Sequence, residues 1–181
     1  MSSLAHSFMT WADFLHLPER AETGHRYELH DGEVILAPPA KPLHIKLQKR
    51  IEQLLEALAG ERYVVAVEFP YRPVVNLQYW VADVACVLRA DWDALPPAEY
   101  PVFAPALIVE VLSPSNTPAK VDRQRMVALS AGAREFWVVD PEKRTVHVTD
   151  LRGSHVYAAG DAIASGMFGA GCVAVARIFA V

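Results

Sequence analysis

Two stretches of the chain read Trp80-Val-Ala-Asp-Val-Ala-Cys-Val-Leu88 and Ala106-Leu-Ile-Val-Glu-Val-Leu112. Apolar runs of this length predict interior strands that are buried on both faces of a sheet. Each run contains one acid, Asp83 or Glu110, and an ionised carboxylate pays a large desolvation penalty there unless a positive group lies against it. If the strands are neighbours, the acids can converge at one end of the sheet and share a divalent cation such as Mg²⁺ or Mn²⁺. The alternative is that each acid only ends its strand or caps nearby backbone groups.

The flanking regions contain both strand and helix patterns. Asp31-Gly32, between apolar runs at 26–29 and 33–37, predicts a β-hairpin. Apolar residues three and four apart predict an amphipathic helix from Pro42 to Ala59. The other expected elements are helices at 10–17 and 118–131 and strands at 63–71, 135–140 and 145–149. We therefore expect one α/β domain over residues 1–181, with a mixed central sheet flanked by helices and an N-terminal hairpin.

Composition limits the classes of function. The 181 residues are 52% hydrophobic, which suffices for one core, and 21 acidic against 17 basic side chains give a net charge of -4. This balance argues against tight nonspecific binding of a polyanion. It does not exclude a nuclease, because clustered carboxylates add negative charge that a bound metal ion offsets.

The cysteines and the N-terminus indicate the cellular compartment. Cys86 and Cys172 lie in apolar surroundings far apart in the sequence, so we expect two buried thiols, no disulfide and a reducing environment. Residues 1–10 lack the basic and apolar segments of a signal peptide, and no stretch reaches the ~18 apolar residues of a membrane span. We therefore expect a cytoplasmic protein without a membrane partner.

Several motifs together resemble the Uma-two family of restriction-endonuclease-like proteins. They follow the family's order over residues 25–150. The matching stretches are Tyr27-Glu-Leu-His-Asp-Gly-Glu33, His44 at the start of the first long helix, Ala82-Asp83-Val84, Pro105-Ala-Leu-Ile-Val-Glu-Val-Leu-Ser-Pro-Ser-Asn116 and Gly132-Ala-Arg-Glu-Phe-Trp-Val-Val-Asp-Pro141.

The resemblance implies a metal-dependent phosphodiesterase that acts on DNA. Asp83 and Glu110 would bind Mg²⁺ or Mn²⁺, which activates water and offsets charge on the phosphoryl oxygens. Glu28 is the candidate third acid, and His44 could bind the scissile phosphate or transfer a proton. The alternatives are that Glu28, like Glu33, belongs to the polar face of a hairpin and that His44 is a boundary histidine.

The usual motif of the superfamily has a lysine two residues after the second acid, and this sequence lacks it. The position two residues after the second acid, on the same strand face, is Leu112, which cannot stabilise an anion. The resemblance implies a substitute eight residues before Gly132, which is Gln124, an uncharged donor. Lys120 lies one helical turn earlier and could supply the missing charge, or it could be a solvated lysine at a helix start. Ala82 replaces the proline expected before the first acid.

These departures leave two main functions open. One is a DNA endonuclease; the other is a catalytically silent nucleic-acid-binding or assembly protein that keeps the fold, and a hydrolase of another phosphate ester is a third. We expect Trp80 and Trp137 to be core residues rather than base-stacking platforms. A homodimer is possible, with the apolar segment 170–181 as either its mating surface or a last core strand.

Overall fold

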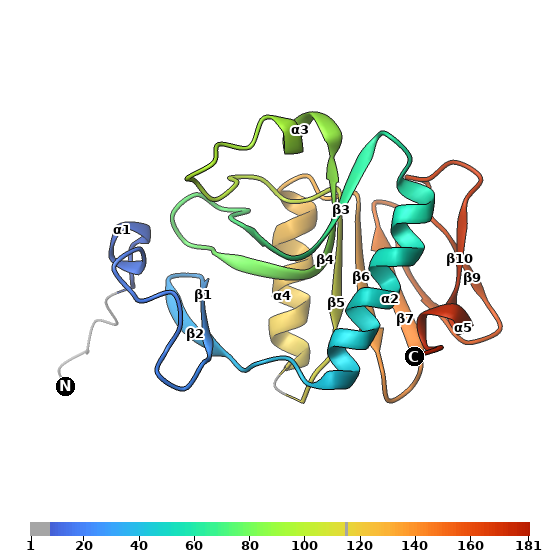
Figure 1. Cartoon of the computed structure of the whole chain (residues 1–181), viewed down its shortest axis with the longest axis horizontal. Helices are drawn as coiled ribbons and strands as arrows, with labels where there is room; N and C mark the ends of the chain where they lie inside the picture. The colour runs from blue at the N-terminus through green and yellow to red at the C-terminus, as the bar shows by residue number, and fades with distance from the viewer. Residues whose placement is uncertain (1–7, 115) are drawn as a thin grey trace.

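A six-stranded mixed sheet forms the centre of the computed structural model, which describes residues 8–114 and 116–181 (Figure 1). Strands β5 and β6 are parallel, and every other neighbouring pair in this sheet is antiparallel. In spatial order the strands are β3 (Tyr63–Tyr71), β4 (Trp80–Leu88), β5 (Leu107–Val111), β6 (Glu135–Asp140), β7 (Thr145–Asp150) and β8 (Gly153–Tyr157). The predicted α/β class is confirmed.

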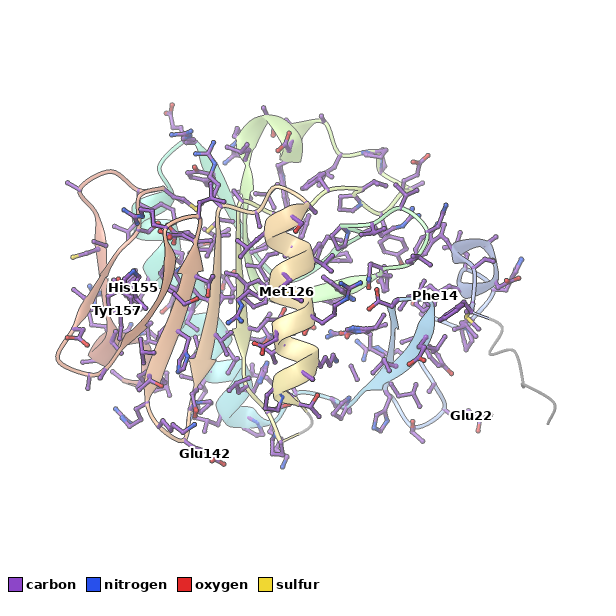
Figure 2. The ribbon with its side chains drawn as sticks, turned by 180° about the vertical axis from the view of Figure 1, so that it is seen from behind. Phe14, Glu22, Met126, Glu142, His155 and Tyr157 are labelled. Atoms are coloured by element: carbon purple, nitrogen blue, oxygen red, sulfur yellow. The ribbon has the colours of Figure 1, made fainter. Side chains whose placement is uncertain are left out.

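Two helices cover opposite faces of this sheet. Helix α2 (Pro42–Ala59) lies in front of the sheet in Figure 1 and α4 (Pro118–Ser130) lies behind it, and Figure 2 shows α4 from its own side with Met126 on the helix. Pro42 starts α2, and Gly60 ends it with a positive φ of 56°. Thr117 caps α4, because its hydroxyl oxygen accepts a hydrogen bond from the Lys120 amide at 3.3 Å.

The core is divided into two layers by the sheet. Leu47, Ile51 and Leu55 of α2 pack against one face, and the side chains of Val121 and Ala128 of α4 pack against the other. Along β5 the side chains alternate, so Leu107, Val109 and Val111 join the α2 layer while Ile108 joins the α4 layer. The prediction that β4 and β5 are buried on both faces is therefore confirmed. Trp80 and Trp137 are also fully buried, as expected for core residues.

The predicted hairpin consists of β1 (Arg26–His30) and β2 (Glu33–Ala37). Asp31 and Gly32 connect them with φ angles of 51° and 81°, which is typical of a tight hairpin turn. The hairpin lies beside the main sheet (Figure 1) and joins it through one backbone bridge between Leu29 and Tyr79, with both hydrogen bonds at 2.9 Å. Helix α1 (Trp11–Phe14) is shorter than the predicted 10–17, because residues 15–17 form turns before Pro18.

The C-terminal region contains elements that the sequence pattern did not predict. After β8, strand β9 (Ala162–Ala164) pairs with β10 (Cys172–Ala174), and α5 (Val175–Ile178) follows. Segment 170–181 was predicted to be either a mating surface or a last core strand, and the structure favours the core, because Val173, Val175, Ile178 and Phe179 are buried in the α2 layer.

Three further expectations meet different outcomes. Cys86 is buried and both cysteines are free, but Cys172 is exposed, so the expectation of a second buried thiol is wrong. No helix in the described part of the chain is long and apolar enough to cross a membrane. The signal-peptide argument rests largely on residues 1–7, which lie outside the described residues.

The short helix α3 (Arg89–Asp93), after β4, was not expected.

A pair of matched substitutions in α2 tests the packing of its buried face. Leu55 is fully buried and Leu43 is 53% exposed, although both are leucines of one helix. We expect Leu55→Ala to lower the free energy of unfolding by about 2–5 kcal/mol, because it removes methyl groups and leaves a cavity. Leu43→Ala should change it by less than about 0.5 kcal/mol. Urea unfolding followed by circular dichroism measures both, and equal losses would contradict the assigned orientation of α2.

Candidate active site

All six predicted site residues line one cleft of about 1130 Å³. They come from five elements, so the cleft is assembled from distant parts of the sequence. The contributors are Glu28 of β1, His44 of α2, Asp83 of β4, Glu110 of β5, and Lys120 and Gln124 of α4.

Asp83 and Glu110 lie where β4 and β5 separate. The antiparallel ladder between these strands ends at the pair Val84–Val109, and the two acids are the next residues outward on each strand. The Asp83 carboxylate replaces the next ladder bond, because its Oδ2 accepts a hydrogen bond from the Val111 amide at 2.7 Å. Each acid is only 7% exposed. The strands are therefore neighbours, and both acids lie at the same end of their ladder.

Helix α2 holds the other oxygen of Asp83. Asp83 Oδ1 lies 2.9 Å from Nε2 of His44 and accepts a hydrogen bond at 3.0 Å from Nε2 of Gln48, one helical turn later. Burial lowers the pKa of His44, but the hydrogen bond and negative charge of Asp83 outweigh it, so the pKa of His44 is raised overall. The orientation of the Asp83 carboxylate is thus set from two sides.

Glu110 has a different environment. It belongs to the α4 face of β5, and its Oε1 is buried without a hydrogen-bond partner among the described residues. Burial raises the pKa of Glu110 well above its usual range, and the negative charges of Asp83 and Glu28 raise it further. Oε1 of Gln124, also buried and lining the cleft, is a second acceptor with no described partner. Unpaired buried oxygens of this kind are costly unless a cation or another donor satisfies them.

The donor set fits a hard divalent cation bound by few protein ligands. Asp83 and Glu110 supply carboxylate oxygens, which Mg²⁺ and Mn²⁺ prefer, and Gln124 supplies an amide oxygen. Within residues 8–114 and 116–181, no three His, Cys, Asp or Glu side chains are grouped as ligands of one ion. Mg²⁺ commonly binds to one or two carboxylates and completes its shell with water and substrate phosphate, so two carboxylates are compatible with it.

The structure does not bring Glu28 into a common ligand set with these two acids. Its carboxylate lies 2.8 Å from Nε2 of His30, 3.1 Å from Arg26 and 3.5 Å from the Lys120 ammonium. Burial raises the pKa of Glu28, but these three partners outweigh it and lower the pKa to about 2. Because basic side chains already compensate its charge, Glu28 holds cations at the cleft instead of needing a metal ion.

Lys120 is the predicted substitute cation, and it faces the cleft. It lies in the first turn of α4, and its partner Glu28 keeps the ammonium near the acids, since the charge of Lys120 acts on the pKa of both Glu28 and Glu110. Leu112 also borders the cleft, but it packs against the apolar α4 layer and offers no charge. Glu33 is exposed at the cleft wall, as expected for the polar face of a hairpin.

Three residues around the acids were not predicted. Arg26 binds both Glu28 and Glu68, while Gln48 donates to both Glu68 and Asp83. A signal was present for Glu68, because it is the single acid in the apolar run Tyr63–Tyr71, just as Asp83 and Glu110 are in theirs. Gln48 is a polar residue on the buried face of α2, which is also a recognisable signal.

Comparisons with known proteins concern the family and the fold of the chain. A family model described as "Uma2: Putative restriction endonuclease" matches residues 11–166. No curated protein matches the chain. One solved structure with a similar fold is described as a "putative nuclease belonging to DUF820" from Anabaena variabilis, with a TM-score of 0.80, 19% identity and coverage of 94% of this chain and 97% of that chain. At this identity the likeness concerns the fold, and the predicted restriction-endonuclease-like fold class is confirmed.

The low pKa of Glu28 predicts a specific loss of stability in acid. The folded state keeps Glu28 ionised down to about pH 2, whereas the unfolded chain binds a proton near the ordinary value of 4.5. The stabilisation is therefore complete above pH 4.5 and falls by about 1.4 kcal/mol for each pH unit below it, until about pH 2. We expect the stability advantage of wild type over Glu28→Gln to shrink by about 1.4 kcal/mol between pH 5.5 and 3.5.

Urea unfolding at the two pH values measures this difference. Glu22→Gln is the matched control, because Glu22 is exposed in the loop before β1 (Figure 2). It should follow wild type at both pH values. The same pH slope for wild type and Glu28→Gln would contradict the assigned role of the three basic partners.

Proposed function

The chain belongs to the Uma2 family of restriction-endonuclease-like proteins, and from this premise we propose that it is a metal-dependent endonuclease that hydrolyses phosphodiester bonds of DNA. Asp83 and Glu110 hold Mg²⁺ or Mn²⁺ in this proposal. The observation that supports it is Oε1 of Glu110, which has no hydrogen-bond partner among the described residues and is buried beside a second carboxylate in the lining of the cleft. A buried acid in that position has a physical reason to exist if a cation occupies the gap between β4 and β5.

The surrounding side chains have separate tasks in this reaction. A bound cation would lower the pKa of water and place positive charge beside the phosphoryl oxygens. Asp83 is oriented by the Val111 amide and by Gln48, so its position does not depend on the substrate. Its neighbour His44, 2.9 Å away, can hold or release a proton next to the reacting phosphate. Gln124 orients water or phosphate through its amide.

The cleft also offers cations for the phosphate backbone. The cleft is lined by the basic side chains of Arg26, Lys41, Lys120 and Arg123. Phosphate contacts from Lys and Arg supply most nonspecific affinity for DNA and depend strongly on salt. A local group of basic side chains therefore supports a DNA partner despite the net charge of -4.

A catalytically silent DNA-binding protein is the second candidate. It is favoured by Leu112 and Gln124, which leave no charged side chain at either position expected for the lysine. Lys120 is the cation that decides between the candidates, because its ammonium lies 3.5 Å from Glu28 and can move towards a phosphate. A homodimer and a cytoplasmic location stay predictions from the sequence.

Metal binding is tested by titration calorimetry with Mn²⁺. We expect wild type to bind and Asp83→Asn to bind at least about tenfold more weakly, because the substitution removes one of two ligand charges. Glu142→Gln is the matched control, since Glu142 is an exposed acid of the same cleft, near the end of the sheet where α4 begins (Figure 2). It should keep wild-type affinity. If wild type does not bind Mn²⁺, the result favours the catalytically silent protein.

Catalysis is tested with supercoiled plasmid and either Mg²⁺ or Mn²⁺. We expect wild type to nick the plasmid and Glu110→Gln to lose this activity, because the amide keeps the shape and removes the charge. Gln124→Lys should nick about tenfold faster than wild type, since a charged hydrogen bond is about twice as strong as a neutral one. Equal nicking by wild type and Glu110→Gln would identify a contaminant, and an unchanged rate for Gln124→Lys would show that position 124 does not face the phosphate.

A further inference from the structure

Glu68 has an unusual backbone conformation directly beside Asp83. Its φ is 51°, in the left-handed region that non-glycine residues rarely occupy inside a strand. The ladder between β3 and β4 pairs Val67 with Val84 and Phe69 with Ala82, but it leaves out the pair between them, which is Glu68 and Asp83. The irregularity therefore lies at the level of the first candidate metal ligand.

The Glu68 side chain contacts the group that orients Asp83. Glu68 Oε1 accepts a hydrogen bond at 2.5 Å from Nε2 of Gln48, and the same Gln48 nitrogen donates to Asp83 Oδ1 at 3.0 Å. Gln48 is only 5% exposed, so its amide is held in one place between two carboxylates. The other oxygen of Glu68 forms an ion pair with Arg26. Glu68 is thus the link between the basic group of the hairpin and the α2 side chain that holds Asp83.

Local stability does not explain this arrangement. The Glu68 side chain is 43% exposed, and exposed ion pairs contribute little to folding. A left-handed glutamate costs free energy relative to an extended one, and strained residues of this kind cluster at functional sites. A glycine would satisfy the backbone at this position without strain, so the carboxylate must be retained for what it binds.

We propose that Glu68 is a positioning residue for Asp83, acting through the amide of Gln48. The proposal rests on the function given above, in which Asp83 is a metal ligand. Glu68 accepts one hydrogen of the Gln48 amide, which directs the other towards Asp83 Oδ1. Asp83 is then held with its Oδ2 on the Val111 amide. Without the Glu68 carboxylate, Gln48 loses one anchor and the Asp83 carboxylate can turn away from Val111.

The test measures the position of Asp83 without any metal. Hydrogen exchange of the Val111 amide reports its bond to Asp83 directly. The variant is Glu68→Gly, which removes the carboxylate and relieves the backbone strain. Arg144→Gly is the matched control, because Arg144 also has a positive φ of 54° and, unlike Glu142 of the same β6–β7 turn, does not line the cleft. Glu68→Gln keeps an acceptor oxygen for Gln48 and serves as the conservative variant. Mn²⁺ affinity and Tm are measured on the same proteins.

In Glu68→Gly we expect the hydrogen of the Val111 amide to exchange about tenfold faster and Mn²⁺ to bind about tenfold more weakly. A factor of about ten corresponds to the loss of one hydrogen bond to a charged group. The Tm of Glu68→Gly should stay close to that of wild type, because the relief of backbone strain is opposed by the greater freedom of glycine in the unfolded chain and by the lost contacts of the carboxylate. Glu68→Gln should recover most of the Val111 protection, and Arg144→Gly should match wild type in exchange and Mn²⁺ affinity.

Two outcomes would overturn the role of Glu68. One is unchanged Val111 exchange in Glu68→Gly, whatever its metal affinity. The other is a lower Tm with faster exchange throughout β4 and β5, which is the result of a purely structural role. If wild type does not bind Mn²⁺ but Glu68→Gly still exposes the Val111 amide, the metal-dependent function fails while the positioning of Asp83 by Glu68 stands.

Discussion

The closeness of two buried carboxylates, Asp83 and Glu110, is the constraint around which the polar groups of the cleft are arranged. Both sit at the end of the β4–β5 ladder and are almost fully shielded from water. The two acids respond differently to this burial. Asp83 has His44, Gln48 and the Val111 amide as hydrogen-bond partners. Glu110 has an oxygen that finds no partner in the described part of the chain, and its pKa is raised because burial and its acidic neighbours oppose its charge. A positive group bound beside Glu110 would therefore offset a charge that the described residues leave largely uncompensated.

The hairpin lines the cleft, and it is held by apolar packing of Leu29 against Tyr79 and Val81 as well as by ion pairs to α4. Its backbone is joined to the segment before β4 by the Leu29–Tyr79 bridge and by a hydrogen bond from the Gly32 amide to the Leu77 carbonyl at 3.1 Å. The bidentate pair of Arg123 with Asp31 and the contact of Lys120 with Glu28 join it to α4. These ion pairs therefore connect the hairpin to α4 and keep basic side chains beside the acids of the cleft.

The sequence patterns predicted α2, β3 and β4 with the same bounds as the structure, because α2 has a clear helical periodicity and β3 and β4 are mostly apolar runs of nine residues. The predictions were weakest where the pattern is short. Strand β8 is mostly exposed and β9 and β10 have three residues each, so no apolar run marks them. Cys172 was expected to be buried because its neighbours are apolar, yet in a three-residue strand the burial alternates and Val173 is the residue that faces the core.

The sequence by itself determined the α/β class, the hairpin and the two acids in apolar strands, because apolar periodicity and desolvation are local properties of a few residues. Only the tertiary structure decided that Asp83 and Glu110 adjoin, since this depends on β4 pairing with β5 and on the register of that pair. It also decided that Glu28 is neutralised by Arg26, His30 and Lys120. The link from Glu68 through Gln48 to Asp83 joins residues up to 35 positions apart. Such contacts depend on how strands bend and helices dock, which no local pattern specifies.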